Sequence, residues 1–144
     1  MSSSEEKVPS GFWIISVLAL LWNLMGVMAF ASEVMMTAEQ IAALPDGQRA
    51  LYANRPLWSL VLFGVGVGAG VLGSVFLLMR QRGALPIFIA SFVAIVIYDG
   101  YWLFGRGGYA VTPVWGLALI AAVITIAIAL IFFARHGARR GWLR

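Results

Sequence analysis

Four long apolar segments constrain this chain more than any other feature. They cover residues 12–31, 57–79, 84–104 and 114–134, and each has the length of about 20 apolar residues that a helix needs to cross a bilayer. Only 11% of the 144 residues are charged, whereas a soluble domain carries about 25%. The sequence therefore predicts an all-α, polytopic membrane protein, with one four-helix transmembrane bundle forming a single membrane domain over residues 1–144.

The basic residues predict how the spans are oriented. A long loop, residues 32–56, follows the first span, and a tail, residues 135–144, follows the last. Seven basic residues lie on the side of the two termini and three on the side of the long loop: Lys7, Arg80, Arg82, Arg135, Arg139, Arg140 and Arg144 against Arg49, Arg55 and Arg106. Since Lys and Arg gather on the cytoplasmic side of a membrane, we expect both termini in the cytoplasm and the long loop outside.

The net charge of +4 has the same explanation, because cytoplasmic Lys and Arg also face anionic headgroups. The positive charge therefore predicts the lipid bilayer as a partner, and no nucleic acid.

"AFASE" at residues 29–33 resembles a signal-peptidase site, but the preceding apolar stretch is longer than a signal core and "MSSSEEK" is partly acidic. We therefore expect this segment to be a retained span.

The long outer loop carries signals for two short helices at the membrane surface. "TAEQ" matches a capping box, with Thr37 as the cap and Gln40 reaching back. Pro45, Asp46 and Gly47 then interrupt the chain, and Asp46 is a candidate cap for a second short helix.

The stretch "FGVGVGAGVLGS" at residues 63–74 has two interpretations. Gly68, Gly70 and Gly73 match the G-x-G-x-x-G pattern of dinucleotide-binding loops, which follows a strand and precedes an acid by about 20 residues. Here no strand signal precedes the pattern, and Val93 stands where the acid is expected. Helix packing is the favoured interpretation, since the glycines fall on two nearly opposite faces, Gly64 and Gly68 on one and Gly66, Gly70 and Gly73 on the other.

Polar residues inside a membrane are costly and are functional candidates. Small and polar residues recur at helical spacing in three spans: Ser16, Ala19, Asn23 and Gly26; Ser91, Ala94 and Tyr98; Ala118, Ala122, Thr125 and Ala129. We expect these stripes to face the interior of the bundle.

Five residues are candidates for a polar pocket that opens outward: Asn23, Tyr98, Asp99, Tyr101 and Arg106. Asn23 and Asp99 both fall in the outer half of the membrane, and the "GRGG" loop would allow the Arg106 guanidinium to pair with an ionised Asp99. The structural alternative is that Asn23 joins helices by hydrogen bonds and that Asp99 and Arg106 form an interfacial ion pair.

Other chemistry is sparse in the sequence. There is no cysteine, the only histidine lies in the basic tail, and no nucleophile–base–acid set is present. Met25, Met28, Met35 and Met36 offer thioethers of the kind that hold Cu(I), but methionine is more often flexible filler. The sequence predicts a protein that is not an enzyme and uses no cofactor or metal.

Three stretches, "VPSGFWIISVLALLWNLMGVMAF", "ALYANRPLW" and "ARRGWLR", resemble small four-span proteins of Gram-negative bacteria that are commonly labelled "sugar transporter". The third span, "YDGYWLFGRGGY", departs from the pattern of that group. The resemblance implies the bacterial inner membrane and four helices, and it assigns no substrate or catalytic residue.

Two functions fit these observations. The glycine faces and the scarcity of buried charge favour a non-enzymatic scaffold, accessory subunit or self-associating bundle, whose partners are other membrane helices in a homo-oligomer or larger membrane complex. The polar cluster and the family label favour the alternative, a transporter or binder of a small, sugar-like solute. No span is broken by an internal proline, whereas transporters usually contain repeats with discontinuous helices.

Overall fold

The computed structural model describes residues 7–144, which form helices joined by short turns. The long helices are α1 (Ser10–Val34), α4 (Leu57–Leu78), α5 (Ala84–Gly100) and α6 (Val114–Arg139). The short ones are α2 (Ala38–Ala42), α3 (Asp46–Ala53), the π-helical turn η1 (Tyr101–Gly105) and the 3-10 turn η2 (Gly108–Ala110). The predicted all-α class is confirmed, and four helices in the described chain are long and apolar enough to cross a membrane.

Prolines set the start of three long helices. Pro9, Pro56 and Pro113 each lie directly before the first helical residue, in extended backbone, where a missing N–H costs nothing. Helices α1 and α6 are longer than the predicted spans, because a helix continues through polar residues beyond its apolar section. The fourth helix thus takes in the first half of the predicted tail.

The turn after α4 does not use Gly83, which lies directly before α5. The chain instead leaves α4 through Arg80, which has a φ of 58°. The Arg80 and Gln81 amides donate to Leu77 and Phe76, the pairing of a Schellman motif.

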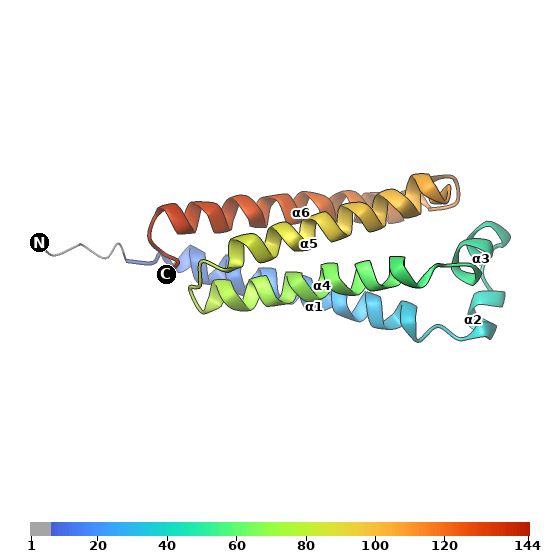
Figure 1. The fold of residues 1–144 in the computed structure, drawn as a ribbon, viewed down its shortest axis with the longest axis horizontal. Coiled ribbons are helices and arrows are strands. Elements are labelled where there is room, and N and C mark those ends of the chain that lie inside the picture. Colours follow the sequence, from blue (N-terminus) through green and yellow to red (C-terminus); the bar gives the residue numbers. More distant parts are fainter. Residues whose placement is uncertain (1–6) are drawn as a thin grey trace, which may run out of the picture.

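The four long helices run alternately up and down and pack in chain order (Figure 1). Helix α1 packs on α4, α4 on α5, and α5 on α6. The end of the bundle that holds Ser10 and Arg144 is here named the terminal end, and the opposite end, which holds α2 and α3, the α3 end (Figure 1). Helices α1 and α6 meet near the terminal end, where the rings of Phe12 and Phe133 stack with centroids 5.7 Å apart.

One glycine face of α4 packs as predicted. A Cβ on Gly66 would lie 2.5 Å from Ile95, and one on Gly73 would lie 2.8 Å from Phe88, so both glycines let α5 approach. A Cβ on Gly70 would overlap the side chain of Asn23 on α1. At these three positions a Cβ would force a neighbouring side chain to move.

On the opposite face of α4, the predicted close packing is present at Gly64 and absent at Gly68. Gly64 is covered by the ring of Phe30, 2.9 Å from a Cβ placed there. Gly68 is exposed, and a Cβ on it would meet no atom within 4 Å. Close packing at Gly68 is therefore absent within the described residues of one chain.

Two of the three predicted stripes face inward. Ser16, Ala19, Ser91, Ala94 and Tyr98 are buried, while Asn23 and Gly26 are partly buried. The third stripe was wrongly placed: Ala118, Thr125 and Ala129 on α6 are exposed and Ala122 is only partly buried. Lipid and a bundle interior are both apolar, so apolar spacing does not tell α6 which face to bury.

The two short helices predicted for the loop of residues 32–56 are present. Thr37 caps α2 in a complete capping box, in which the Thr37 amide donates to the Gln40 side-chain oxygen at 2.9 Å. Pro45 occupies the cap position of α3, and Asp46 is its first helical residue. The prediction for Asp46 is therefore off by one residue.

The apolar core lies at the terminal end. It contains Phe12 of α1, Leu77 of α4, Ala84 and Phe88 of α5, Leu130 and Ala134 of α6, and Leu143 of the C-terminal segment. Leu143 is 1% exposed. The C-terminal segment therefore closes this end of the bundle.

Candidate functional site

A cavity of about 520 Å³ lies between the four long helices. Its walls come from α1, α4, α5 and α6, and α3 and the turn before α6 contribute at the α3 end. The cavity extends from Phe88 and Leu130, which belong to the core, to Gln48 and Tyr52 of α3. This volume falls in the range of small-molecule sites, about 300–1,000 Å³.

Small residues explain why this space is not filled. Helix α1 presents Gly26 and Ala29 to the cavity, and α6 presents Gly116 and Ala127. Helix α6 packs chiefly on α5, and it meets α1 near the terminal end, where Phe12 and Phe133 stack. The cavity consequently lies where α6 stands apart from α1.

Asn23 and Ser91 provide polar groups toward the terminal end of the cavity. The Asn23 amide donates to the Ala19 carbonyl at 2.8 Å and to the Ser74 hydroxyl at 3.2 Å. The Ser91 hydroxyl donates to the Gly66 carbonyl at 2.6 Å. Both donors are thus engaged by protein, and Asn23 ties α1 to α4, as the structural interpretation predicts.

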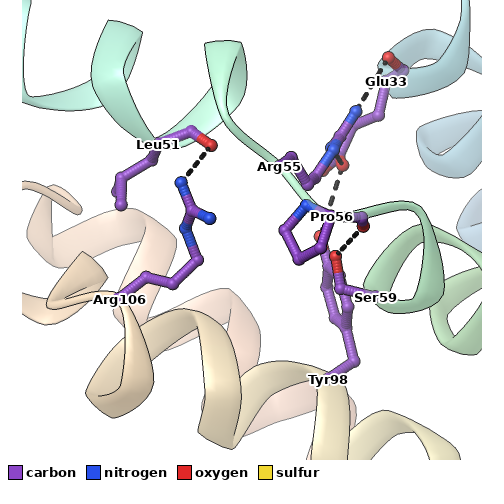
Figure 2. Close-up of polar contacts among 7 residues, drawn as sticks. All are labelled: Glu33, Leu51, Arg55, Pro56, Ser59, Tyr98 and Arg106. Atoms are coloured by element: carbon purple, nitrogen blue, oxygen red, sulfur yellow. Dashed lines mark hydrogen bonds and ion pairs between the residues drawn. The ribbon is translucent and has the colours of Figure 1, made fainter.

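The α3 end of the cavity is organised by an ion pair that the sequence analysis missed. Arg55 pairs with Glu33, and the Tyr98 hydroxyl donates to the same Glu33 oxygen at 3.3 Å (Figure 2). The Arg55 and Glu33 side chains are 11% and 23% exposed. A signal for this pair exists in the sequence, because the acid at the end of the first span and the base just before the second must lie at the same membrane face.

Tyr52 packs beside this pair. The Arg55 guanidinium lies 5.4 Å from the centre of the Tyr52 ring, within reach of a cation–π contact. Burial raises the pKa of the Tyr52 hydroxyl, and the nearby Glu33 charge adds to this effect, while Arg55 opposes it. Tyr52 is therefore a neutral phenol whose hydroxyl is a possible donor at the cavity wall.

The predicted pairing of Asp99 with Arg106 is wrong. The Arg106 guanidinium donates to backbone carbonyls of α3 and its C-cap: Asn54 at 2.8 Å, Leu51 at 3.0 Å and Ala50 at 3.4 Å (Figure 2 shows the bond to Leu51). The last carbonyls of a helix lack partners within it and carry partial negative charge. Arg106 satisfies three of these acceptors at once.

Asp99 lies in the cavity wall without a counter-ion. It is 9% exposed, and within residues 7–144 neither an ion pair nor a hydrogen bond engages its carboxyl group. Two other acidic residues do have basic partners, since Arg55 pairs with Glu33 and Arg49 with Asp46. Asp99 is thus a buried carboxyl group that faces open space.

The predicted pocket residues divide into two groups. Asn23, Tyr98 and Asp99 line the cavity. Tyr101 and Arg106 do not, because η1 turns Tyr101 toward α4, where its ring lies 4.4 Å from that of Trp58. The outward polar pocket therefore loses two predicted members and gains Glu33, Gln48 and Tyr52.

The described residues contain no group of three His, Asp or Glu side chains that could hold a metal ion. Of the four methionines considered for copper, Met25 lines the cavity.

No protein family, curated protein or solved structure matches this chain. The site is accordingly interpreted from its own geometry.

Proposed function

We propose that this chain is a multi-pass membrane protein that binds an amphipathic small molecule between its helices. The observation that carries the proposal is the cavity itself, with most of its polar side chains at the α3 end and, apart from Asn23 and Ser91, apolar side chains over the rest. A ligand with a polar end and an apolar body would match both regions at once.

The same distribution argues against a freely soluble, sugar-like ligand. A polyol carries hydroxyl groups on all sides, and burying a hydroxyl without a hydrogen bond is costly. In the apolar section of the cavity, between Leu130 and Ile120 on α6, such groups would find few acceptors. We therefore keep the binding of a small solute as the proposed function, but the proposed ligand is amphipathic and not sugar-like.

The proposed location is the bacterial inner membrane, with both termini in the cytoplasm. The seven-to-three distribution of basic residues supports this orientation, and the resemblance to four-span inner-membrane proteins supports the compartment. In this orientation the polar end of the cavity lies in the outer half of the bilayer.

Two matched substitutions on α6 test the proposal. Ile120 lines the cavity, whereas Ile128 is 39% exposed on the outside. Ile120→Trp should fill the cavity and displace a bound molecule, and Ile128→Trp should not. The measurement is mass spectrometry of small molecules extracted from the purified proteins.

We expect wild type and Ile128→Trp to release the same amphipathic molecule and Ile120→Trp to release little of it. Identical extracts from all three proteins would contradict the proposal.

A second candidate function is self-association or service as an accessory subunit. It is supported by small residues that are exposed in the described part of the chain, Gly68 on α4 and Ala118, Thr125 and Ala129 on α6. Gly68→Leu should then reduce the oligomeric mass measured by native mass spectrometry, while Val65→Leu, at a neighbouring position that already carries a bulky exposed side chain, should not. Neither candidate function is enzymatic.

A further inference from the structure

We propose that the ligand of this cavity is a cation with an apolar body, held at its charged end by the Asp99 carboxylate. The inference rests on the proposed ligand-binding function and names the chemical class of the ligand. It follows from the charges of the cavity wall and from its aromatic side chains.

The cavity wall carries acidic residues and no basic ones among the described residues. Glu33 and Asp99 both line it, and Glu33 is already neutralised by Arg55. Asp99 has no such partner, because Arg106 is committed to the carbonyls of α3. An ionised carboxylate in an apolar site needs an opposite charge nearby, and the remaining place for that charge is the cavity.

Aromatic rings surround the same end of the cavity. Tyr52, Tyr98, Trp102 and Trp115 all line it. The Tyr52 and Trp102 rings pack against each other with centroids 5.1 Å apart. Aromatic faces attract cations, most strongly where water is excluded, and they also accept the apolar groups of a substituted ammonium or phosphonium ion.

Other ligand charges fit this wall poorly. An anion would approach Asp99 and Glu33 with no basic side chain in the wall to receive it. A neutral amphipath would supply no charge to hold Asp99 in its ionised form, which burial alone disfavours. The arrangement of charges thus selects a cation.

A pair of probes of equal shape and opposite charge tests this inference. Tetraphenylphosphonium and tetraphenylborate are titrated separately onto the full-length protein in nanodiscs, with protein-free nanodiscs subtracted. The proteins are wild type, Asp99→Asn, Asp99→Glu and Asp46→Asn. Asp46 is a matched control, because it is an acidic residue of α3 whose side chain is 96% exposed.

We expect saturable binding of the cation to wild type and to Asp46→Asn, and much weaker binding of the anion. Asp99→Asn should lower the affinity for the cation on the order of tenfold or more, as the loss of one charge pair requires. Asp99→Glu, which keeps the charge, should retain most of the affinity. Retained affinity in Asp99→Glu would show that a substitution at this position does not by itself disrupt the fold.

Three results would overturn the inference: equal affinity of wild type for both probes, no effect of Asp99→Asn on cation binding, or no saturable cation binding by wild type. None of them would remove the proposed function, which is decided separately by the extracts of Ile120→Trp and Ile128→Trp.

Discussion

Glu33 and Arg55 hold together the α3 end of this molecule. The pair joins the last turn of α1 to the residue before Pro56, and the Arg55 guanidinium also donates to the Glu33 carbonyl at 3.4 Å. Both side chains are largely buried, so removal of either partner leaves the other charge with little compensation. The pair stabilises the fold in two ways: the opposite charges attract each other, and neither charge is left buried without a partner.

A double-mutant cycle on this pair measures the coupling. We expect Glu33→Gln and Arg55→Gln each to lower the free energy of unfolding in detergent by about 1–3 kcal/mol, since the pair lies between the exposed and fully buried extremes. The double variant should lose less than the sum of the two, because it leaves no unpaired charge. Additive losses would show that the side chains do not interact.

Glycines on α4 provide a prediction at the level of one helix. Gly70→Ala should destabilise the protein by about 1–3 kcal/mol, because its Cβ would force Asn23 away from α4. Gly68→Ala should be neutral or stabilise by about 0.5–1 kcal/mol, because nothing opposes its Cβ in this chain and alanine favours helices over glycine. Thermal unfolding of both variants in detergent is the measurement.

Equal effects of the two substitutions would contradict the assignment of faces. A large loss from Gly68→Ala alone would indicate a partner helix on that face.

Arg106 is expected to control the stability of α3. Arg106→Lys keeps the charge but loses the planar group that reaches three carbonyls. We expect faster hydrogen exchange of the α3 amides in this variant, with the α2 amides unchanged because α2 is held by its own capping box. Exchange measured by mass spectrometry on peptides from each helix decides the point, and unchanged exchange in α3 would contradict the capping role.

Helices, their number and their caps could be predicted from the sequence, because each depends on local pattern. The capping box at Thr37 and the prolines before α4 and α6 are examples. The inward face of α6 could not be predicted in this way, because lipid and protein interior are equally apolar and leave no amphipathic signal.

The residues of the cavity could be predicted only in part, because their contacts depend on distant segments of the chain. Tyr98 and Asp99 share one polar segment, but the partner of Asp99 depends on which acceptors compete for Arg106. Those acceptors are carbonyls of α3, more than fifty residues earlier in the chain. The volume itself depends on how far α6 stands from α1, and no short stretch of sequence encodes that separation.

At the scale of the whole molecule, the C-terminal segment closes the terminal end. The Arg144 amide donates to the Arg80 carbonyl at 2.6 Å, and the Arg82 amide donates to the Arg144 carbonyl at 3.0 Å. The Arg80 guanidinium adds a bond of 2.7 Å to the Trp142 carbonyl. These bonds hold Leu143 in the core and fix Arg80 in a conformation that non-glycine residues seldom adopt.

Leu143→Ala should therefore cost about 2–5 kcal/mol of unfolding free energy, as expected for a fully buried leucine. Leu119→Ala, at an exposed position on α6, is the matched control and should cost much less. Thermal unfolding in detergent compares the two, and equal losses would show that the segment does not seal the core.

The orientation of the whole molecule gives the last prediction. The chain has no cysteine, so a single introduced thiol reports its own side of the membrane. Glu39 on α2 and Arg139 on α6 are both exposed, at opposite ends of the bundle (Figure 1). Because seven of ten basic residues lie at or beyond the terminal end, a membrane-impermeant maleimide applied to bacterial spheroplasts should label Glu39→Cys at once and Arg139→Cys only after lysis. The reverse pattern would place the polar end of the cavity in the cytoplasmic half of the bilayer, and a ligand would then have to enter from inside the cell.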